Sequence, residues 1–279
     1  MLRLHEYEIG HDVVAFSTTR HGGISVGNYF SFNINHYCGD EPQAVAANRE
    51  LLCHHLSIDA NHLVYPHQTH QTEIRHITER YLALSEQQRA DFLEGVDAVI
   101  TDIPGICIGV STADCIPVLL FDQQHHAVSA IHAGWRGTVA RIVEKTVKDM
   151  IDTYNTDVSH LRAVIGPGIS LNNFEVGDEV YAAFEQNGFD MNAIAQQFPT
   201  TDEGQSEIVN SKLSNRKWRW HLDLPECNRL QLLNTGVQED NIILSGICTY
   251  DRHLDFFSAR RLGINSGRIF TGIMMKSVK

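Results

Sequence analysis

A thiol and an imidazole stand at the ends of two short apolar runs near the middle of the chain. The runs cover residues 116–121 and 127–132; Cys115 directly precedes the first and His132 ends the second. Each run has the length of a strand, and together they are typical of a β-hairpin. Residues facing each other across such a hairpin are close enough to bind one ligand. The pattern therefore predicts a Cys/His pair at one end of a sheet.

The register of this hairpin decides whether the two side chains share a face. With a four-residue loop over 122–125, Phe121 pairs with His126, and Cys115 then lies opposite His132. A loop one residue longer or shorter would place them on opposite faces.

A second histidine would complete a metal site. His67 and His70 lie three residues apart in the stretch 63–74, which Pro66 and its β-branched neighbours make extended. Only one of them is then expected to reach the Cys/His pair, and the residue pattern leaves both candidates open. Two histidines and one thiolate are the ligands of a catalytic zinc with one open position. Copper(II) could occupy the same ligands, which it commonly binds more tightly.

The segment after His132 contains two glycines for a tight turn and leads into an amphipathic helix expected over 139–151. Its N-terminus, with Arg136 alongside, is a candidate anion site. An earlier glycine-rich loop, 18–25, contains Arg20; its spacing favours a turn, with a loop that holds a ligand against its backbone as the alternative. Asn33 lies in a strand-like run, where its polar side chain needs solvent or a partner.

Other chemistry is compatible with the same residues. Cys115 could be a nucleophile with His132 as its base and no metal. A metal-stabilised binding module is a non-catalytic alternative. A multicopper oxidase needs several His-x-His pairs, and the chain contains none.

Composition narrows the classes of partner and compartment. The 279 residues carry a formal net charge of −12, which argues against nucleic acid or an anionic membrane as the main partner. Six cysteines without a CxxC pair favour reduced thiols and a cytoplasmic location. Charged residues interrupt the first twelve positions, so no signal peptide is expected, and no apolar window is long enough for a transmembrane helix.

Alternating strand-like and helical segments predict an α/β (α+β) fold in one domain over 1–279. Strands are expected at 13–17, 95–102, 106–110, 161–165, 242–244 and 256–258. Helices are expected at 42–56, from 174 toward 184 and at 222–235, and a long irregular connection at 196–220.

Several motifs together resemble the multi-copper polyphenol oxidase family, also called the laccase-domain proteins. The main ones are Gln68-x-His70, Asp97-Ala98-x-x-Thr101, Thr112-Ala113-Asp114-Cys115-x-Pro117 and His132-Ala133-Gly134-Trp135-Arg136-Gly137-Thr138. Further matches are Arg20-x-Gly22-Gly23-x-Ser25, Gly166-Pro167-x-Ile169, Glu175-Val176-Gly177, Cys248-Thr249, Phe256-Phe257-Ser258 and Gly267-Arg268.

The resemblance implies a zinc-dependent purine nucleoside phosphorylase acting on inosine, guanosine and adenosine. Adenosine deaminase and methylthioadenosine phosphorylase activities would accompany it. The implied zinc ligands are His70, Cys115 and His132, so that His67 becomes a neighbour of the site. The implied fold has mixed β-sheets sandwiched between helices and is cysteine-hydrolase-like. Editing of peptidoglycan precursors by a cysteine hydrolase and copper-dependent polyphenol oxidation are the alternatives.

Phosphorolysis requires an anion site, for which Arg20 and Arg136 are the candidates, with Asn33 as a further substrate-binding candidate. Asp114 is expected either to transfer protons or to orient His132. Two positions depart from the family pattern: Gln71 stands where glycine usually follows the ligand histidine, and Ala259 where an aromatic residue often stands. Both departures bear on the substrate range.

Overall fold

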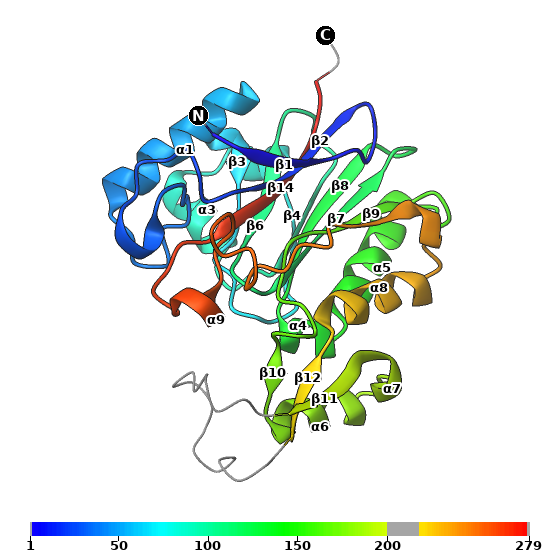
Figure 1. The fold of residues 1–279 in the computed structure, drawn as a ribbon. Helices are drawn as coiled ribbons and strands as arrows, with labels where there is room; N and C mark the ends of the chain where they lie inside the picture. Colours follow the sequence, from blue (N-terminus) through cyan, green and yellow to red (C-terminus); the bar gives the residue numbers. More distant parts are fainter. Residues whose placement is uncertain (1, 200–217, 278–279) are drawn as a thin grey trace.

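Two large mixed sheets pack face to face and are enclosed by helices (Figure 1). The computed structural model describes residues 2–199 and 218–277. The predicted α/β class, with mixed sheets between helices, is confirmed. Within the described residues, no helix combines the length and apolar character needed to span a bilayer.

The strands form three sheets. The five-stranded sheet, in the order β1-β2-β14-β6-β3, contains β1 (Leu4–Tyr7), β2 (Val13–Thr18), β3 (Leu63–Val64), β6 (Cys107–Thr112) and β14 (Ile269–Met275). The six-stranded sheet, in the order β13-β9-β7-β8-β5-β4, contains β4 (Ile74–His76), β5 (Ala98–Thr101), β7 (Ile116–Asp122), β8 (Ala127–Ala133), β9 (Arg162–Ile165) and β13 (Ile242–Leu244). The three-stranded sheet, β10-β12-β11, contains β10 (Glu175–Val176), β11 (Ala195–Pro199) and β12 (Trp218–Leu222).

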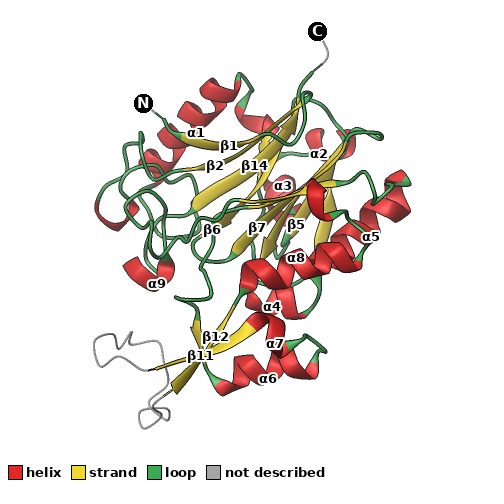
Figure 2. Cartoon of the chain, turned by 45° about the vertical axis from the view of Figure 1, so that its right-hand side comes forward, coloured by secondary structure: helices red, strands yellow, loops and turns green. Residues whose placement is uncertain are grey.

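The helices cover the outer faces of the two large sheets and flank the small one (Figure 2). They are α1 (Pro42–Leu56), α2 (Glu79–Leu82), α3 (Glu86–Phe92), α4 (Trp135–Val139), α5 (Ile142–Tyr154), α6 (Asp178–Gln186), α7 (Met191–Ile194), α8 (Leu224–Asn234) and α9 (Ala259–Leu262). The predicted helix over 42–56 is confirmed, and α8 lies within the helix expected at 222–235.

Three apolar layers hold this arrangement together. Between the two large sheets, Ile108 and Ile273 lie in one fully buried cluster with Leu119. A second layer packs α5 and α8 on the six-stranded sheet, and a third packs α1 on the five-stranded sheet. Layers on both faces explain why every residue of β7 and β8 is buried and why most of these residues are apolar.

The hairpin of β7 and β8 forms as expected but in a different register. Phe121 pairs with Val128 rather than with His126, and the loop covers 123–126. His132 therefore lies opposite Pro117, two positions along from Cys115. Because side chains alternate with a period of two, this shift leaves Cys115 and His132 on the same face.

The helix expected over 139–151 is displaced and interrupted. Arg141, at φ 63°, separates the short helix α4 from α5. The predicted apolar positions of α5, such as Val143 and Val147, are buried, but Ile151 is 37% exposed. The helix that begins beside the Cys/His pair is thus α4, a single short turn.

Three further expectations are corrected. Glu175 and Val176 pair with β12, so that α6 begins only at Asp178. The predicted strand at 256–258 is absent, since both phenylalanines are buried in a small cluster and Ser258 caps α9 through its side chain. The irregular connection expected at 196–220 is bounded by β11 and β12, and its positions 200–217 lie outside the described residues.

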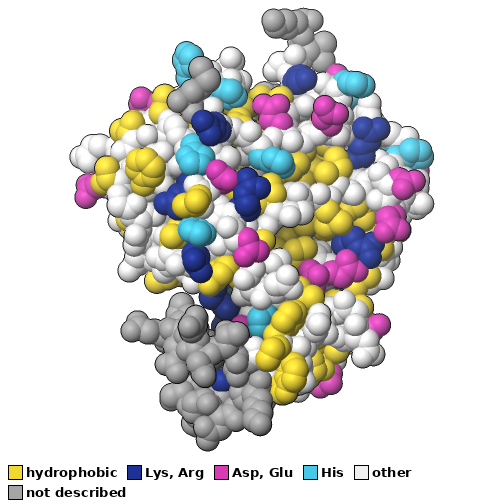
Figure 3. All heavy atoms as spheres, in the orientation of Figure 1, with side chains coloured by type: hydrophobic (Ala, Val, Ile, Leu, Met, Phe, Trp, Pro, Cys, Tyr) yellow, Lys and Arg dark blue, Asp and Glu magenta, His cyan; other side chains and the backbone are white. Residues whose placement is uncertain are grey.

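Charge is distributed without a single dominant sign on the face shown in space-filling form (Figure 3). Basic, acidic and histidine side chains alternate there with apolar ones. The net negative charge of the chain is therefore not collected into one acidic patch on this face.

Candidate metal centre

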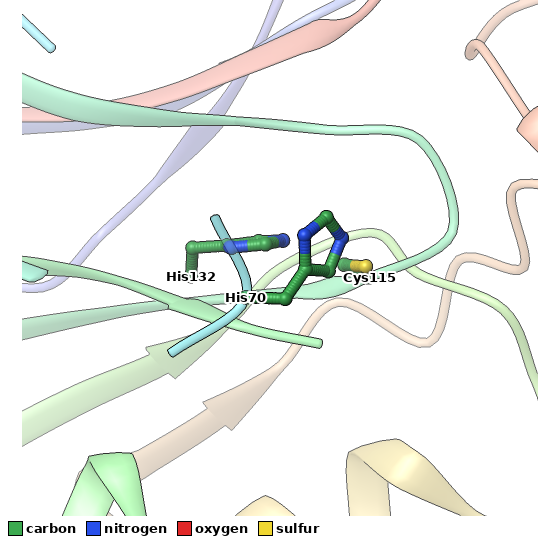
Figure 4. Close-up of side chains that lie close together, drawn as sticks. All are labelled: His70, Cys115 and His132. Atoms are coloured by element: carbon green, nitrogen blue, oxygen red, sulfur yellow. The ribbon is translucent and has the colours of Figure 1, made fainter. Parts of the chain in front are cut away.

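His70, Cys115 and His132 point toward one another at one end of the β7–β8 hairpin (Figure 4). One ring nitrogen of each histidine and the Cys115 Sγ all lie within 4.8 Å of one another. The two imidazole rings meet edge to face, with their centroids 4.7 Å apart. Segments that are remote in the sequence thus supply three donor atoms to one point.

The backbone explains how His70 reaches the other two. It lies in the loop between β3 and β4, in the left-handed region at φ 63°, which non-glycine residues adopt only when held there. The Asp97 carboxylate, which accepts the His70 backbone N–H, stabilises this conformation. The geometry matches the choice of His70 over His67, because the His67 Nδ1 lies 2.9 Å from the Glu94 carboxylate.

Asp97 holds both histidines in place. Its Oδ1 accepts hydrogen bonds from His132 Nδ1 at 2.7 Å and from the His70 backbone N–H at 3.0 Å. Its Oδ2 accepts from the backbone N–H groups of Gln71 at 2.8 Å and Thr69 at 3.3 Å. The carboxylate is fully buried, and with Nδ1 bound to it, His132 presents Nε2 to a ligand.

The pKa of Asp97 supports this assignment. Burial by itself raises the pKa, but the hydrogen bond and charge of His132 and the backbone donors lower it below its ordinary value. In the sequence, Asp97 stands out only as part of the Asp97-Ala98-x-x-Thr101 motif. An aspartate directly before a short strand-like run was the signal that could have identified it.

Asp114 does not contact His132. Its Oδ1 accepts from Thr249 Oγ1 and its Oδ2 from the backbone N–H of Arg260, both at 2.6 Å. The expectation that Asp114 orients His132 is therefore corrected, since Asp97 occupies that position. Asp114 instead connects the start of β7 to α9, and its proposed part in proton transfer stays a prediction.

His132 and His70 favour the thiolate form of Cys115. Burial by itself raises the pKa of the thiol, but the charges and hydrogen bonds of His132 and His70 outweigh burial and lower the pKa to about 6. For His132, burial lowers the pKa, and the Cys115 thiolate and Asp97 raise it above its ordinary value. A thiolate between two imidazoles is the donor set that zinc prefers.

The three candidate ligands form part of the wall of a pocket of about 190 Å³. Asn35, Tyr37 and Arg268 are among the other residues that line it. None of the described residues lining this pocket is an aspartate or a glutamate. The pocket therefore offers metal ligands and hydrogen-bond donors, without a carboxylate.

Arg20 and Asn33 do not line this pocket. The Arg20 guanidinium donates to the carbonyl oxygens of Phe30 and His253 and lies over the Phe257 ring. Asn33 is fully buried and makes its hydrogen bonds within its own loop and to the Arg268 backbone. Both side chains thus hold the loops around the pocket, and their expected contact with substrate stays a prediction.

Arg136 is exposed, outside the residues that line the pocket, and its guanidinium lies 4.2 Å from the centroid of the Trp135 ring. Its expected anion contact also stays a prediction.

Arg268 is the arginine whose side chain the structure places in the pocket wall. In the sequence, Arg268 stands out only through the Gly267-Arg268 match.

Gly134 keeps space free beside the candidate ligands. A Cβ at this position would lie 2.9 Å from His70 Cδ2 and 3.1 Å from Cys115 Sγ. We expect Gly134→Ala to displace one ligand and to weaken zinc binding by about 5- to 150-fold, which corresponds to the ~1–3 kcal/mol typical of overpacking. Competition for zinc with a chromogenic chelator measures this. Unchanged affinity would show that the ligands can move apart without cost.

Comparison with known proteins identifies the family of the chain. Residues 14–276 match the family described as multi-copper polyphenol oxidoreductase laccase. The chain belongs to this family. The match covers most of the chain, including all three candidate ligands, and confirms the resemblance drawn from the motifs.

The relatives of this laccase-like chain include named enzymes of purine metabolism. It is 49% identical over 260 residues to a purine nucleoside phosphorylase of Bacteroides thetaiotaomicron, covering 93% of this chain and 90% of the relative. It is 43% identical over 265 residues to adenosine deaminase RL5 of an unknown prokaryotic organism, covering 95% of this chain and 94% of that one.

Solved structures share the fold. YlmD from Geobacillus stearothermophilus superposes with a TM-score of 0.83 at 29% identity, over 97% of this chain and 94% of its own. YfiH from Bacillus licheniformis superposes with a TM-score of 0.82 at 30% identity, over 95% and 93%. The arrangement of sheets and helices is therefore that of this family.

Proposed function

We propose that the protein is a zinc-dependent purine nucleoside phosphorylase acting on inosine, guanosine and adenosine. Adenosine deaminase and methylthioadenosine phosphorylase activities are proposed as side activities. The observation that carries the proposal is the His70, Cys115 and His132 group in the wall of a pocket. The names of the relatives support the purine nucleoside as substrate.

The donor set fits zinc, and three protein ligands leave a fourth position for a reactant. Bound there, zinc would supply a Lewis acid at the pocket wall. The chain's own residues hold this geometry: Asp97 fixes the ring of His132 and the loop of His70, and the two histidines favour the Cys115 thiolate.

The proposed reactions use the same pocket. In phosphorolysis an oxygen of phosphate forms a bond to ribose C1′ while the C1′–N9 bond breaks, and the purine takes up a proton as it leaves. In deamination water adds to purine C6 and ammonia leaves. A pocket without carboxylates suits an anionic reactant, because no carboxylate in its described wall repels phosphate.

Metal analysis combined with an activity assay tests the proposal. Protein purified without added metal should contain about one zinc per chain. It should release hypoxanthine from inosine in phosphate and ammonia from adenosine. Chelation should abolish both activities, and added zinc should restore them. Copper in place of zinc, or phosphorolysis that persists after complete metal removal, would contradict the zinc assignment.

A cysteine hydrolase acting on peptidoglycan precursors is the second candidate, and the lowered pKa of Cys115 is the observation that favours it. It predicts activity that survives chelation and is lost on thiol alkylation. All six cysteines are free in the structure, which is consistent with the proposed cytoplasmic location.

A further inference from the structure

Arg268 carries an unpaired positive charge in the pocket wall. Its guanidinium donates to the carbonyl oxygens of Ile264, Ser266 and Gly267, which uses three of its five N–H groups. The Nε–H and one Nη2–H have no partner among the described residues, and none of these residues brings a carboxylate within ion-pair distance. Backbone carbonyl groups hold the guanidinium in place, and two of its N–H groups remain for a ligand.

Asn35 supplies another donor in the same wall. It is 8% exposed, and its Oδ1 accepts the backbone N–H of Tyr37 at 2.7 Å. This bond sets the orientation of the amide. Its Nδ2 has no hydrogen-bond partner within the described parts of the chain. Asn35 lines the pocket, and its Nδ2 is not one of the polar atoms sealed from solvent without a partner. This N–H is therefore free to donate to a ligand in the pocket.

Asn33 links these two residues from behind the pocket. Its Oδ1 accepts the backbone N–H of Asn35 at 3.2 Å and that of Arg268 at 3.1 Å. Its Nδ2 donates to Asp40 Oδ2 at 2.9 Å. One fully buried amide therefore sets the spacing between two segments that are more than 200 residues apart in the sequence.

We propose that Arg268 and Asn35 form the phosphate subsite of the pocket, with Asn33 as its positioning residue. A guanidinium and an amide N–H are donors that match the oxygens of a tetrahedral anion, and the described wall contains no carboxylate that would compete for the guanidinium. The identity of the anion as free phosphate rests on the proposed phosphorolysis. The subsite lies on the same pocket as His70, Cys115 and His132.

Titration of the zinc-loaded protein with inorganic phosphate, followed by calorimetry, tests the assignment. Arg268→Gln removes the charge, and Asn35→Asp keeps the shape and the bond to Tyr37 while it replaces the free donor by a negative oxygen. Each is expected to weaken phosphate binding by at least about tenfold, as for loss of a charge-assisted hydrogen bond. Arg261→Gln is the matched control: Arg261 is an exposed arginine of α9 whose guanidinium lies over Tyr250, outside the pocket wall.

Phosphate binding and nucleoside cleavage are measured separately, so that a failure of the phosphate subsite can be told from a failure of the proposed function. Arg268→Gln could weaken phosphate binding indirectly, by loosening the 263–268 turn. Asn35→Asp avoids this ambiguity, because its zinc content and thermal stability should stay unchanged. If the parent protein binds phosphate through Arg268 but cleaves no nucleoside, the subsite stands and the phosphorylase proposal fails. If nucleoside is cleaved and the phosphate KM is unchanged in both variants, the subsite is overturned.

Two other results would also overturn the phosphate subsite. One is a parent protein that binds no inorganic phosphate. The other is a loss of binding confined to a nucleoside 5′-monophosphate, with inorganic phosphate bound as before. That result would assign the guanidinium to the phosphoryl group of a nucleotide.

Discussion

Replacing Cys115 by serine is expected to remove bound zinc and enzymatic activity together. The variant exchanges a thiolate, the soft ligand of the group, for a hydroxyl that stays protonated at neutral pH. The loss in activity should exceed the ~10- to 100-fold that follows removal of an outer hydrogen-bond partner of a metal ligand. Zinc per chain by atomic emission and inosine phosphorolysis, measured on the same preparation, check this.

Cys248→Ser is the matched control. Cys248 is also a half-buried free cysteine, and its Sγ accepts from Ser170 Oγ at 3.2 Å, outside the candidate ligand group. The control should keep both its zinc and its activity. Full activity with stoichiometric zinc in Cys115→Ser would remove Cys115 from the metal site, and loss of activity with zinc retained would favour a nucleophilic cysteine.

Asp97→Asn is expected to lower zinc affinity by about 10- to 100-fold. The carboxylate accepts four N–H donors from the two histidine segments, and an asparagine amide presents its own N–H groups to some of them. One or more buried donors then lack an acceptor, which should also lower the free energy of unfolding by roughly 1–3 kcal/mol. Chelator competition and denaturant unfolding of the zinc-free protein measure the two effects separately.

Asp122→Asn is the control that distinguishes loss of histidine positioning from a general loss of folding stability. Asp122 is also buried, and it accepts the backbone N–H groups of Gln124 and His125 and contacts the His125 Nδ1, at the opposite end of the same hairpin. We expect it to lose stability but to keep zinc affinity. If both variants lost zinc affinity to the same degree, the effect of Asp97 would be one of stability alone.

Local patterning determined the central hairpin and the Cys/His pair. The expected register was displaced by two positions, yet Cys115 and His132 share a face because any even displacement preserves the alternation of a strand. The apolar stripe of α5 and the helix at Pro42–Leu56 were determined in the same way, by spacing within a few turns.

The strand β14 was missed for a reason that follows from its position. It lies between β2 and β6, and all seven of its residues are buried, so it lacks the alternation of polar and apolar residues that marks a half-exposed strand. The aromatic run at 256–258 has the composition of a strand, although those residues pair with none of the described strands.

Residue types and their spacing identified the candidate metal ligands and placed two of them on one face of a hairpin. The folded chain was needed to show that Asp97, and not Asp114, holds His132. It also decided that Arg268, and not Arg20 or Arg136, faces the pocket. The physical reason is that these choices depend on contacts between segments brought together by packing of the two sheets. Periodicity reports which face of its own element a residue occupies, and carries no information on what that face will meet.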